Sequence, residues 1–248
     1  MDILANKYRP KKLSELIGQE SVIKILTNSI QSNKLHHAYI FCGKFGCGKT
    51  SSARIFAASV NGKDGPSLEP DLSDPRITEI FEGRSVDIIE LDAASNRSID
   101  DIRNLRERIR YSPIQSKYRF IIIDEAHRLT GDAAEAALKM LEEPPANCIF
   151  ILCTTNPEDL KTTIHSRCMP LRFSKVAVDQ LVINLQRVAK AEGLSYDDAA
   201  LKIAARLSRG SVRNSLQNLE TMMTFANGGK ITAEIAQQAL SAVDENKY

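Results

Sequence analysis

The chain has 248 residues, of which 43% are hydrophobic and 26% charged, and its 33 basic and 31 acidic residues give a net charge of +2. These values exclude a disordered chain, and the balanced charge leaves any nucleic-acid binding to a local patch. The longest apolar run, Cys148 to Cys153, is too short for a membrane span, and the first residues lack a secretory segment, so we expect no membrane association and a cytoplasmic location.

Five apolar runs alternate with helical patterns over the first part of the chain. They cover residues 37–41, 86–91, 119–123 and 148–153, with a weaker run at 169–173. Continuous apolar runs separated by ten or more residues indicate strands covered on both faces, and hence a parallel α/β sheet. After residue 174 the apolar residues recur at helical spacing. We therefore predict an α/β domain over residues 1–174 and a small all-helical domain of three to four helices over residues 175–248.

A glycine-rich segment follows the first apolar run. Gly43–Thr50, with the sequence GKFGCGKT, fits the phosphate-binding pattern G-x-x-x-x-G-K-[ST] at every position and leads into a helical stretch. Its glycines let successive backbone N–H groups point at phosphate oxygens, and the helix N-terminus adds partial positive charge. We expect Lys49 to reach the terminal phosphates and Thr50 to offer its hydroxyl to Mg²⁺. The pattern predicts a nucleotide site.

Residues 99–110 have the pattern of an amphipathic helix, which Ser98 is placed to cap. Arg103, Arg106 and Arg110 recur at spacings of three and four, on a face separate from the apolar residues. Such a row can contact DNA phosphates without reading bases, or it can be a solvated helix face. The residues alone leave both interpretations open.

An apolar strand that ends in two acids supplies the second half of the predicted site. Asp124 and Glu125 follow the run at 119–123, and the carboxyl edge of a parallel sheet is where α/β proteins bind ligands. We expect Asp124 to hold Mg²⁺, through water, and Glu125 to polarise the water that attacks the γ-phosphate. The alternative is an acidic helix cap. The adjacent glutamate favours nucleoside triphosphate hydrolysis over transfer to a substrate hydroxyl.

Further strings make a family resemblance specific. They are KYRP at Lys7–Pro10, IGQ at Ile17–Gln19, HHAYIF at His36–Phe41, LDAAS at Leu91–Ser95, LKMLEEPP at Leu138–Pro145, SRC at Ser166–Cys168 and GSVRNSL at Gly210–Leu216. With the phosphate loop and the acidic pair, the chain resembles the AAA+ ATPase subunits of DNA polymerase clamp loaders, and most of all the gamma/tau subunits of bacterial DNA polymerase III. The resemblance extends over residues 5–220.

The resemblance implies an AAA+ fold, in which a parallel-sheet ATPase domain is followed by a helical lid. It implies a Mg²⁺-dependent ATPase that couples ATP binding and hydrolysis to the loading of a sliding clamp on primed DNA. The expected partners are other clamp-loader subunits in a ring, the sliding clamp, and primed double-stranded DNA contacted through its backbone. In this family the helix after the second strand lines the DNA channel, which favours the DNA interpretation of Arg103, Arg106 and Arg110.

The resemblance also implies roles for individual residues. Residues expected to contact the nucleotide are Ala5, Tyr8, Arg9, Pro10, Ile17, Gly43, Lys44, Phe45, Gly46, Cys47, Gly48, Lys49, Thr50, Ser51 and Arg213. Thr155 is expected to be a first sensor that bonds the attacking water or the γ-phosphate. Arg213 is expected to sense the γ-phosphate from the lid in the same chain, and Arg167 to act in trans on a neighbour's nucleotide.

The sequence departs from gamma/tau subunits in two respects. Gly62, Asp71, Asp74 and Ile77 stand where the family has four zinc-binding cysteines, and glycine and isoleucine offer no ligand side chain. The five cysteines that are present form no C-x-x-C pair. We therefore expect reduced cysteines and no zinc. The family also has a helical collar domain after the lid, for which we expect no room here, so that the chain is either truncated or assembles differently.

Three other functions remain alternatives. They are a non-catalytic scaffold subunit that binds nucleotide to hold an interface, another AAA+ DNA motor such as a branch-migration helicase, and a small-molecule kinase. The intact Lys49, Asp124, Glu125 and Arg167 argue against an inert scaffold, and a kinase would explain neither SRC nor the lid motif.

Overall fold

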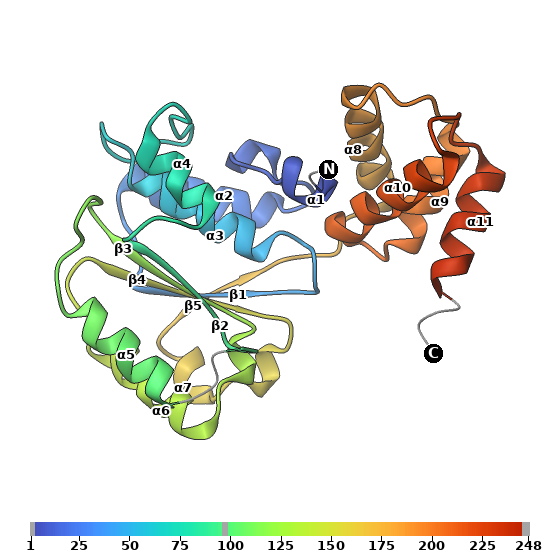
Figure 1. Cartoon of the computed structure of the whole chain (residues 1–248). Helices are drawn as coiled ribbons and strands as arrows, with labels where there is room; N and C mark the ends of the chain where they lie inside the picture. Colours follow the sequence, from blue (N-terminus) through green and yellow to red (C-terminus); the bar gives the residue numbers. More distant parts are fainter. Residues whose placement is uncertain (1–2, 96–98, 245–248) are drawn as a thin grey trace.

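The computed structural model describes residues 3–95 and 99–244, in which a parallel sheet carries helices on both faces and a group of helices stands beside it (Figure 1). The strands are β1 (Ala38–Cys42), β2 (Ile88–Asp92), β3 (Arg119–Asp124), β4 (Cys148–Thr154) and β5 (Met169–Arg172). The helices that accompany them are α1 (Leu4–Lys7), α2 (Glu20–Ser32), α3 (Lys49–Val60), α4 (Pro75–Glu82), α5 (Ile99–Ile109), α6 (Gly131–Glu142) and α7 (Thr162–His165). The last helices are α8 (Val178–Ala191), α9 (Asp198–Leu207), α10 (Val212–Ala226) and α11 (Ala233–Asp244).

The sheet confirms the predicted α/β class. Its strand order is β2-β3-β4-β1-β5, and every neighbouring pair is parallel. Each of the five apolar runs became a strand, including the weaker one, which forms the edge strand β5. The strand β2 begins two residues after the start of its apolar run, because Val86 is half-exposed and Asp87 forms a buried ion pair.

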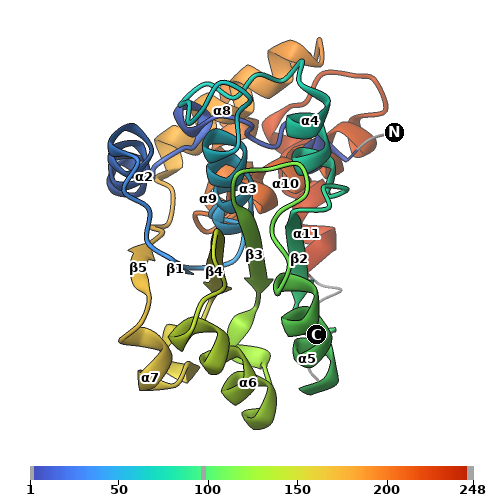
Figure 2. The same cartoon turned by 90° about the vertical axis from the view of Figure 1, so that its left-hand side faces the viewer.

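The two faces of the sheet are covered by different helices. α2, α3 and α4 lie on one face, and α5, α6 and α7 lie on the other (Figures 1 and 2). Phe56 of α3 packs edge-to-face on Tyr39 and Phe120 of the strands, with ring centroids 5.3 and 5.6 Å apart. On the other face, Ile102, Leu105 and Ile109 of α5 are buried. This double cover explains why β1 and β4 are buried at every position.

The helices after β5 form a second apolar core, as the helical periodicity predicts. Leu181, Leu185, Leu201, Leu219 and Met222 are all fully buried in it. The N-terminal segment joins this core, because Leu4 is buried there and Tyr8 and Ile17 pack against it. In the described ranges, no helix is both long and apolar enough to cross a lipid bilayer. We propose to divide the chain between residues 174 and 175, in the connection between β5 and α8.

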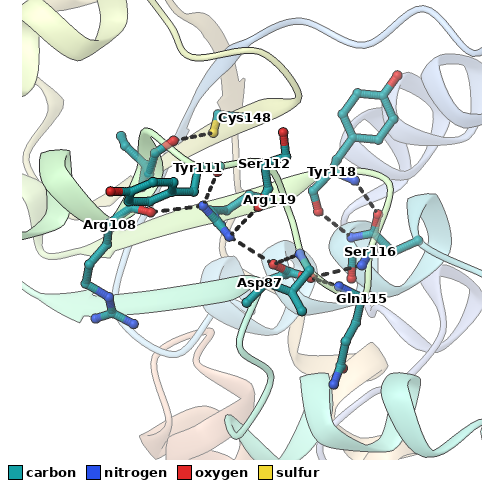
Figure 3. Close-up of polar contacts among 12 residues, drawn as sticks. Asp87, Arg108, Tyr111, Ser112, Gln115, Ser116, Tyr118, Arg119 and Cys148 are labelled. Carbon is teal, nitrogen blue, oxygen red and sulfur yellow. Dashed lines mark hydrogen bonds and ion pairs between the residues drawn. The ribbon is translucent and has the colours of Figure 1, made fainter.

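A buried ion pair ties the starts of β2 and β3 to the end of α5 (Figure 3). Asp87 is fully buried and lies 3.1 Å from the Arg119 guanidinium. It also accepts hydrogen bonds from the backbone N–H groups of residues 114–116, at 2.7–3.1 Å. Arg119 in turn donates to the carbonyl oxygens of Arg108, Tyr111 and Ser112. The pair therefore closes the C-terminal end of α5 and fixes the loop that leads to β3.

The same contacts set the acidity of Asp87. Burial alone would raise the pKa of its carboxyl, but the backbone hydrogen bonds and the Arg119 guanidinium outweigh burial and hold that pKa below its usual range. A lowered pKa in the folded state stabilises the protein above the unfolded pKa, about 3.9, and this contribution is lost as the pH falls through the folded value.

We predict that Asp87→Asn lowers the free energy of unfolding by about 3 kcal/mol at pH 7, because it leaves the buried Arg119 charge without its counter-ion. Urea denaturation across pH 2–8 measures this loss, which should shrink as the pH falls below about 4. Asp64→Asn, at an exposed carboxyl, is the matched control and should change stability by less than about 0.5 kcal/mol. Equal stability of Asp87→Asn and wild type at pH 7 would contradict this account.

Candidate nucleotide-binding site

The glycine-rich segment forms a loop between the end of β1 and the start of α3. Gly48 caps α3 with φ +101°, a left-handed backbone that suits glycine, and α3 begins at Lys49. The Lys49 side chain is buried, and its ammonium donates to the carbonyl oxygens of Gly43 at 2.7 Å and Lys44 at 3.2 Å. The loop thus wraps around the Lys49 ammonium, and the N-terminus of α3 lies directly beside it.

The two predicted acids lie at the end of β3, next to this loop. The Thr50 hydroxyl donates to the Asp124 carboxylate at 2.8 Å, so that both expected Mg²⁺ ligands are adjacent. The Glu125 backbone has φ +49° and ψ +41°, in the left-handed region that a residue other than glycine rarely adopts. Such strain persists only where the surroundings impose it, and it is frequent at functional sites.

Two side chains hold Glu125: Thr155, which follows the neighbouring strand β4, and His127, which lies further along the chain from Glu125 itself. The Thr155 hydroxyl donates to the Glu125 carboxylate at 3.2 Å, and the His127 imidazole lies 3.6 Å from the same oxygen. His127 also bonds the Thr154 hydroxyl at 2.9 Å. The structure therefore brings Thr155 and Glu125 together. The sequence analysis gave His127 no role, although it follows Glu125 by only two residues.

A cavity of about 570 Å³ joins the phosphate loop to the N-terminal segment and the lid helices. Of the predicted site residues, the lining includes Ala5, Tyr8, Arg9, Pro10, Ile17, Phe45, Gly46, Cys47, Gly48, Lys49, Thr50, Ser51, Asp124, Glu125 and Arg213. Gly43 and Lys44 belong to the loop but do not line the cavity, and neither do Thr155 and Arg167. The segments that meet here range from Ala5 near the start of the chain to Leu216 of α10.

The lid touches the phosphate loop directly. The backbone N–H groups of Val212 and Arg213, in the first turn of α10, point at the Gly46 carbonyl oxygen, at 3.0 and 3.4 Å. The Arg213 guanidinium lies over the Phe45 ring, 5.2 Å from its centroid. Ser211 caps α10 through Asn214 and stands against Gly46. A change in the conformation of the phosphate loop would therefore alter its contacts with the first turn of α10 directly.

The cavity also holds polar groups that the sequence analysis missed. Arg54 of α3 makes two hydrogen bonds to the Glu90 carboxylate of β2, at 2.6 and 2.7 Å. Burial, followed by the nearby Arg54 charge, lowers the pKa of Arg9. Asn184 and Arg187 of α8 line the cavity as well, and Arg187 lies over the Tyr8 ring at 5.8 Å. Arg9 was predicted from the KYRP string, but no local pattern distinguishes Arg54, Glu90, Asn184 or Arg187, because only the folding of distant segments brings them together.

Arg167 lies apart from this cavity, in the turn between α7 and β5. Its guanidinium pairs with Glu142 at the end of α6, at 2.8 Å, and donates to the Thr163 carbonyl oxygen at 2.8 Å. About a third of the side chain is exposed. This position agrees with a residue that does not serve its own phosphate loop.

The three predicted arginines are exposed, with Arg103 and Arg106 on α5 and Arg110 directly after it, and two of them form ion pairs. Arg103 pairs with Asp100 at 3.3 Å, and Arg110 pairs with Glu107 at 3.0 Å. Arg106 has no ion pair with any residue that the structure describes. Ser98, which was expected to cap this helix, lies outside the described residues. Exposed pairs of this kind contribute little to stability and can open to bind another anion.

Three of the four positions that replace the expected zinc ligands have structural roles. Asp74 caps α4 through the Arg76 N–H and also pairs with its guanidinium. Asp71 accepts hydrogen bonds from Ser73, and Ile77 is buried in the core. In the part of the chain that the structure describes, no three His, Cys, Asp or Glu side chains gather as a metal site would require. All five cysteines are free and buried, as expected.

Residues 18–177 match the protein family described as DNA polymerase III, delta subunit. The chain belongs to this family. Among its relatives, the DNA polymerase III subunit tau of Bacillus subtilis is 38% identical over 238 residues, and the subunit tau of Escherichia coli is 35% identical over 245 residues. The subunit gamma/tau of Mycobacterium tuberculosis is 39% identical over 243 residues.

These alignments cover 96–99% of this chain but only 38–42% of the relatives, so the chain spans about two fifths of their length. A solved structure of the RuvB Holliday junction branch migration motor from Thermotoga maritima superposes with a TM-score of 0.71 at 22% identity, over 95% of this chain and 72% of that one. The likeness shows that this member of the DNA polymerase III family has the AAA+ fold, with a parallel-sheet domain and a helical lid.

We predict that Gly46→Ala separates the lid from the phosphate loop. A methyl group there would overlap the Ser211 hydroxyl and lie 3.1 Å from the Arg213 Cβ. Gly65→Ala is the matched control, because Gly65 also has a positive φ but nothing lies within 4 Å. Backbone strain alone should lower the melting temperature by about 2–8 °C in both variants. In calorimetry, the melting temperature of Gly46→Ala should be lower than that of Gly65→Ala, because only the first variant also loses the contact with the lid. Equal melting temperatures would show that the contact is dispensable.

Proposed function

We propose that this chain is an ATP-binding and ATP-hydrolysing subunit of a DNA polymerase clamp loader, which couples the nucleotide cycle to the loading of a sliding clamp on primed DNA. One observation carries the proposal: a single cavity is lined by the phosphate loop, by Asp124 and Glu125, and by Arg213 of the lid. Membership of the DNA polymerase III family and the AAA+ fold support the same function. A cytoplasmic location would follow from it.

Thr50 and Asp124 would hold Mg²⁺. A hydroxyl and a carboxylate are oxygen ligands of the kind that this ion prefers, and the 2.8 Å between their oxygens fits adjacent positions around one ion or its water shell. When bound, the ion would neutralise charge on the phosphates. Lys49 would bind the terminal phosphates, exchanging the carbonyl oxygens of Gly43 and Lys44 for phosphate oxygens.

Glu125 would accept a proton from the attacking water. Its strained backbone and the Thr155 hydroxyl bond fix the carboxylate at the phosphate end of the cavity. The resemblance implied that Thr155 bonds the water or the γ-phosphate itself. Since Thr155 donates to Glu125 here, we propose that it orients the base and, through it, the water.

Two arginines would link the chemistry to the assembly. Arg213 would leave the Phe45 ring and reach the γ-phosphate, which pulls α10 toward the loop. Arg167 would stabilise the transferring phosphoryl group of a neighbouring subunit, a role that its place outside its own cavity supports. The Glu142 carboxylate would hold the Arg167 side chain extended until the neighbour docks.

The other clamp-loader subunits in a ring, the sliding clamp and primed DNA are the proposed partners. Arg103, Arg106 and Arg110 would contact the DNA backbone, and the exposure of all three supports this. An inert scaffold subunit would not need the strained Glu125 or its Thr155 partner. Another AAA+ DNA motor is the remaining alternative, and the relatives named DNA polymerase III subunits argue against it.

We predict that Lys49→Ala abolishes ATP binding, because it removes the phosphate-binding charge of the loop. Glu125→Gln should bind ATP normally and hydrolyse it about 10²–10⁴-fold more slowly, since an amide is not a base. Calorimetry measures binding, and single-turnover phosphate release in the presence of partner subunits, clamp and primed DNA measures hydrolysis.

Lys24→Ala and Glu158→Gln, at exposed positions, are the matched controls for these two substitutions. Both should behave as wild type. A wild-type chain that binds ATP but never hydrolyses it would favour the scaffold alternative, and equal loss of binding in Lys49→Ala and Glu125→Gln would overturn the division of roles.

A further inference from the structure

The cavity lining has two chemically different parts. Lys49, Thr50 and Asp124 are polar and lie at the carboxyl edge of the sheet. Ile17 of the N-terminal segment and Val212 and Leu216 of α10 supply apolar surface, and all three belong to the core of the C-terminal helices or pack against it. A flat, largely apolar purine suits such a surface. If the proposed function holds, the apolar part of the lining receives the base.

One polar side chain of α8 that lines the cavity is buried. Asn184 is only 4% exposed, yet it lines the cavity. Leu181, Leu185 and Val188 of the same helix are fully buried in the lid core, so that Asn184 stands where the helix passes from the core to the cavity. A buried amide is costly unless its donors and acceptor are used, and this one therefore needs an explanation.

Arg187 fixes which way the amide points. Its guanidinium lies 3.0 Å from Asn184 Oδ1, one turn away on α8. Arginine has only donors, so the atom that faces it must be the amide oxygen, and the NH₂ group points elsewhere. Arg187 itself lies over the Tyr8 ring, and the Tyr8 hydroxyl donates to Glu192. The orientation of the amide is thus held from two segments.

The NH₂ group of Asn184 has no hydrogen-bond partner among the residues that the structure describes. The NH₂ group is also not fully enclosed by protein. In the described ranges, the side-chain atoms that are both fully enclosed and without a partner belong to Ser52, Ser59 and Arg119. Because Asn184 lines the cavity, a ligand that binds there and offers an acceptor would satisfy the donors of the Asn184 NH₂ group.

We propose that Asn184 is a specificity-determining residue, whose amide NH₂ donates a hydrogen bond to a ring nitrogen of the adenine base, with Arg187 as the positioning residue. This inference rests on the proposed function, since it assumes that ATP is the ligand. Adenine presents N1, N3 and N7 as unprotonated acceptors at its edges. Each of these nitrogens can accept a hydrogen bond from the Asn184 NH₂ group. The Asn184 oxygen does not compete, because it already accepts from Arg187.

The test compares ATP with its 1-deaza, 3-deaza and 7-deaza analogues, each of which replaces one ring nitrogen by C–H. Calorimetric dissociation constants are measured for wild type, for Asn184→Leu and for the isosteric Asn184→Asp. In wild type, one analogue should bind about tenfold more weakly than ATP, as the loss of one hydrogen bond implies. In both variants, ATP should bind more weakly and the ratio of that analogue to ATP should fall to about 1.

Asn104→Asp makes the same chemical change at an exposed position on α5 and should leave every dissociation constant unchanged. Because ratios are compared, a general effect of the new charge in Asn184→Asp on triphosphate binding cancels. The inference is overturned if no analogue binds more weakly than ATP to wild type, or if the variants keep the wild-type ratio. If wild type binds no ATP, the proposed function fails instead.

Discussion

The Gly46 carbonyl oxygen connects the two parts of this molecule. It belongs to the phosphate loop, and the first two N–H groups of α10 point at it. These N–H groups have no partner within their own helix, so the loop completes the lid helix. Gly46 also leaves no room for a side chain beside Ser211. Any ligand that reshapes the loop must therefore keep this contact or break it, and in either case the lid responds.

The sheet supports this junction from the other side. The parallel strands bring the loop after β1 and the acids after β3 to one edge, with only β4 between them. Thr155, which follows β4, then holds Glu125. At the opposite end of the strands, Asp87 and Arg119 close α5 onto β2 and β3. The chemistry at one edge and the proposed DNA-facing helix are thus fixed to the same rigid layer.

Much of this arrangement could be predicted from the sequence. The five strands follow from continuous apolar runs, and the phosphate loop and the acidic pair follow from short patterns whose spacing is local. The lid helices follow from periodicity. In contrast, the contact between Asn184 and Arg187, the Arg54–Glu90 pair and the bond from Thr155 to Glu125 could not be predicted. Their partners are ordinary polar residues, and only tertiary packing determines which of them meet and which face the cavity.

The central claim is that nucleotide binding acts on the lid through the loop. Amide hydrogen exchange with and without ATP and Mg²⁺ tests it most directly, read over the loop at residues 43–50 and the first turn of α10 at residues 211–217. We expect ATP to slow exchange in both segments of the wild-type chain, and in the loop alone when Gly46 is replaced by alanine, because that methyl group would separate the loop from Ser211 and the first turn of α10. Slower exchange in the loop of the wild-type chain, with no change in the first turn of α10, would contradict the account.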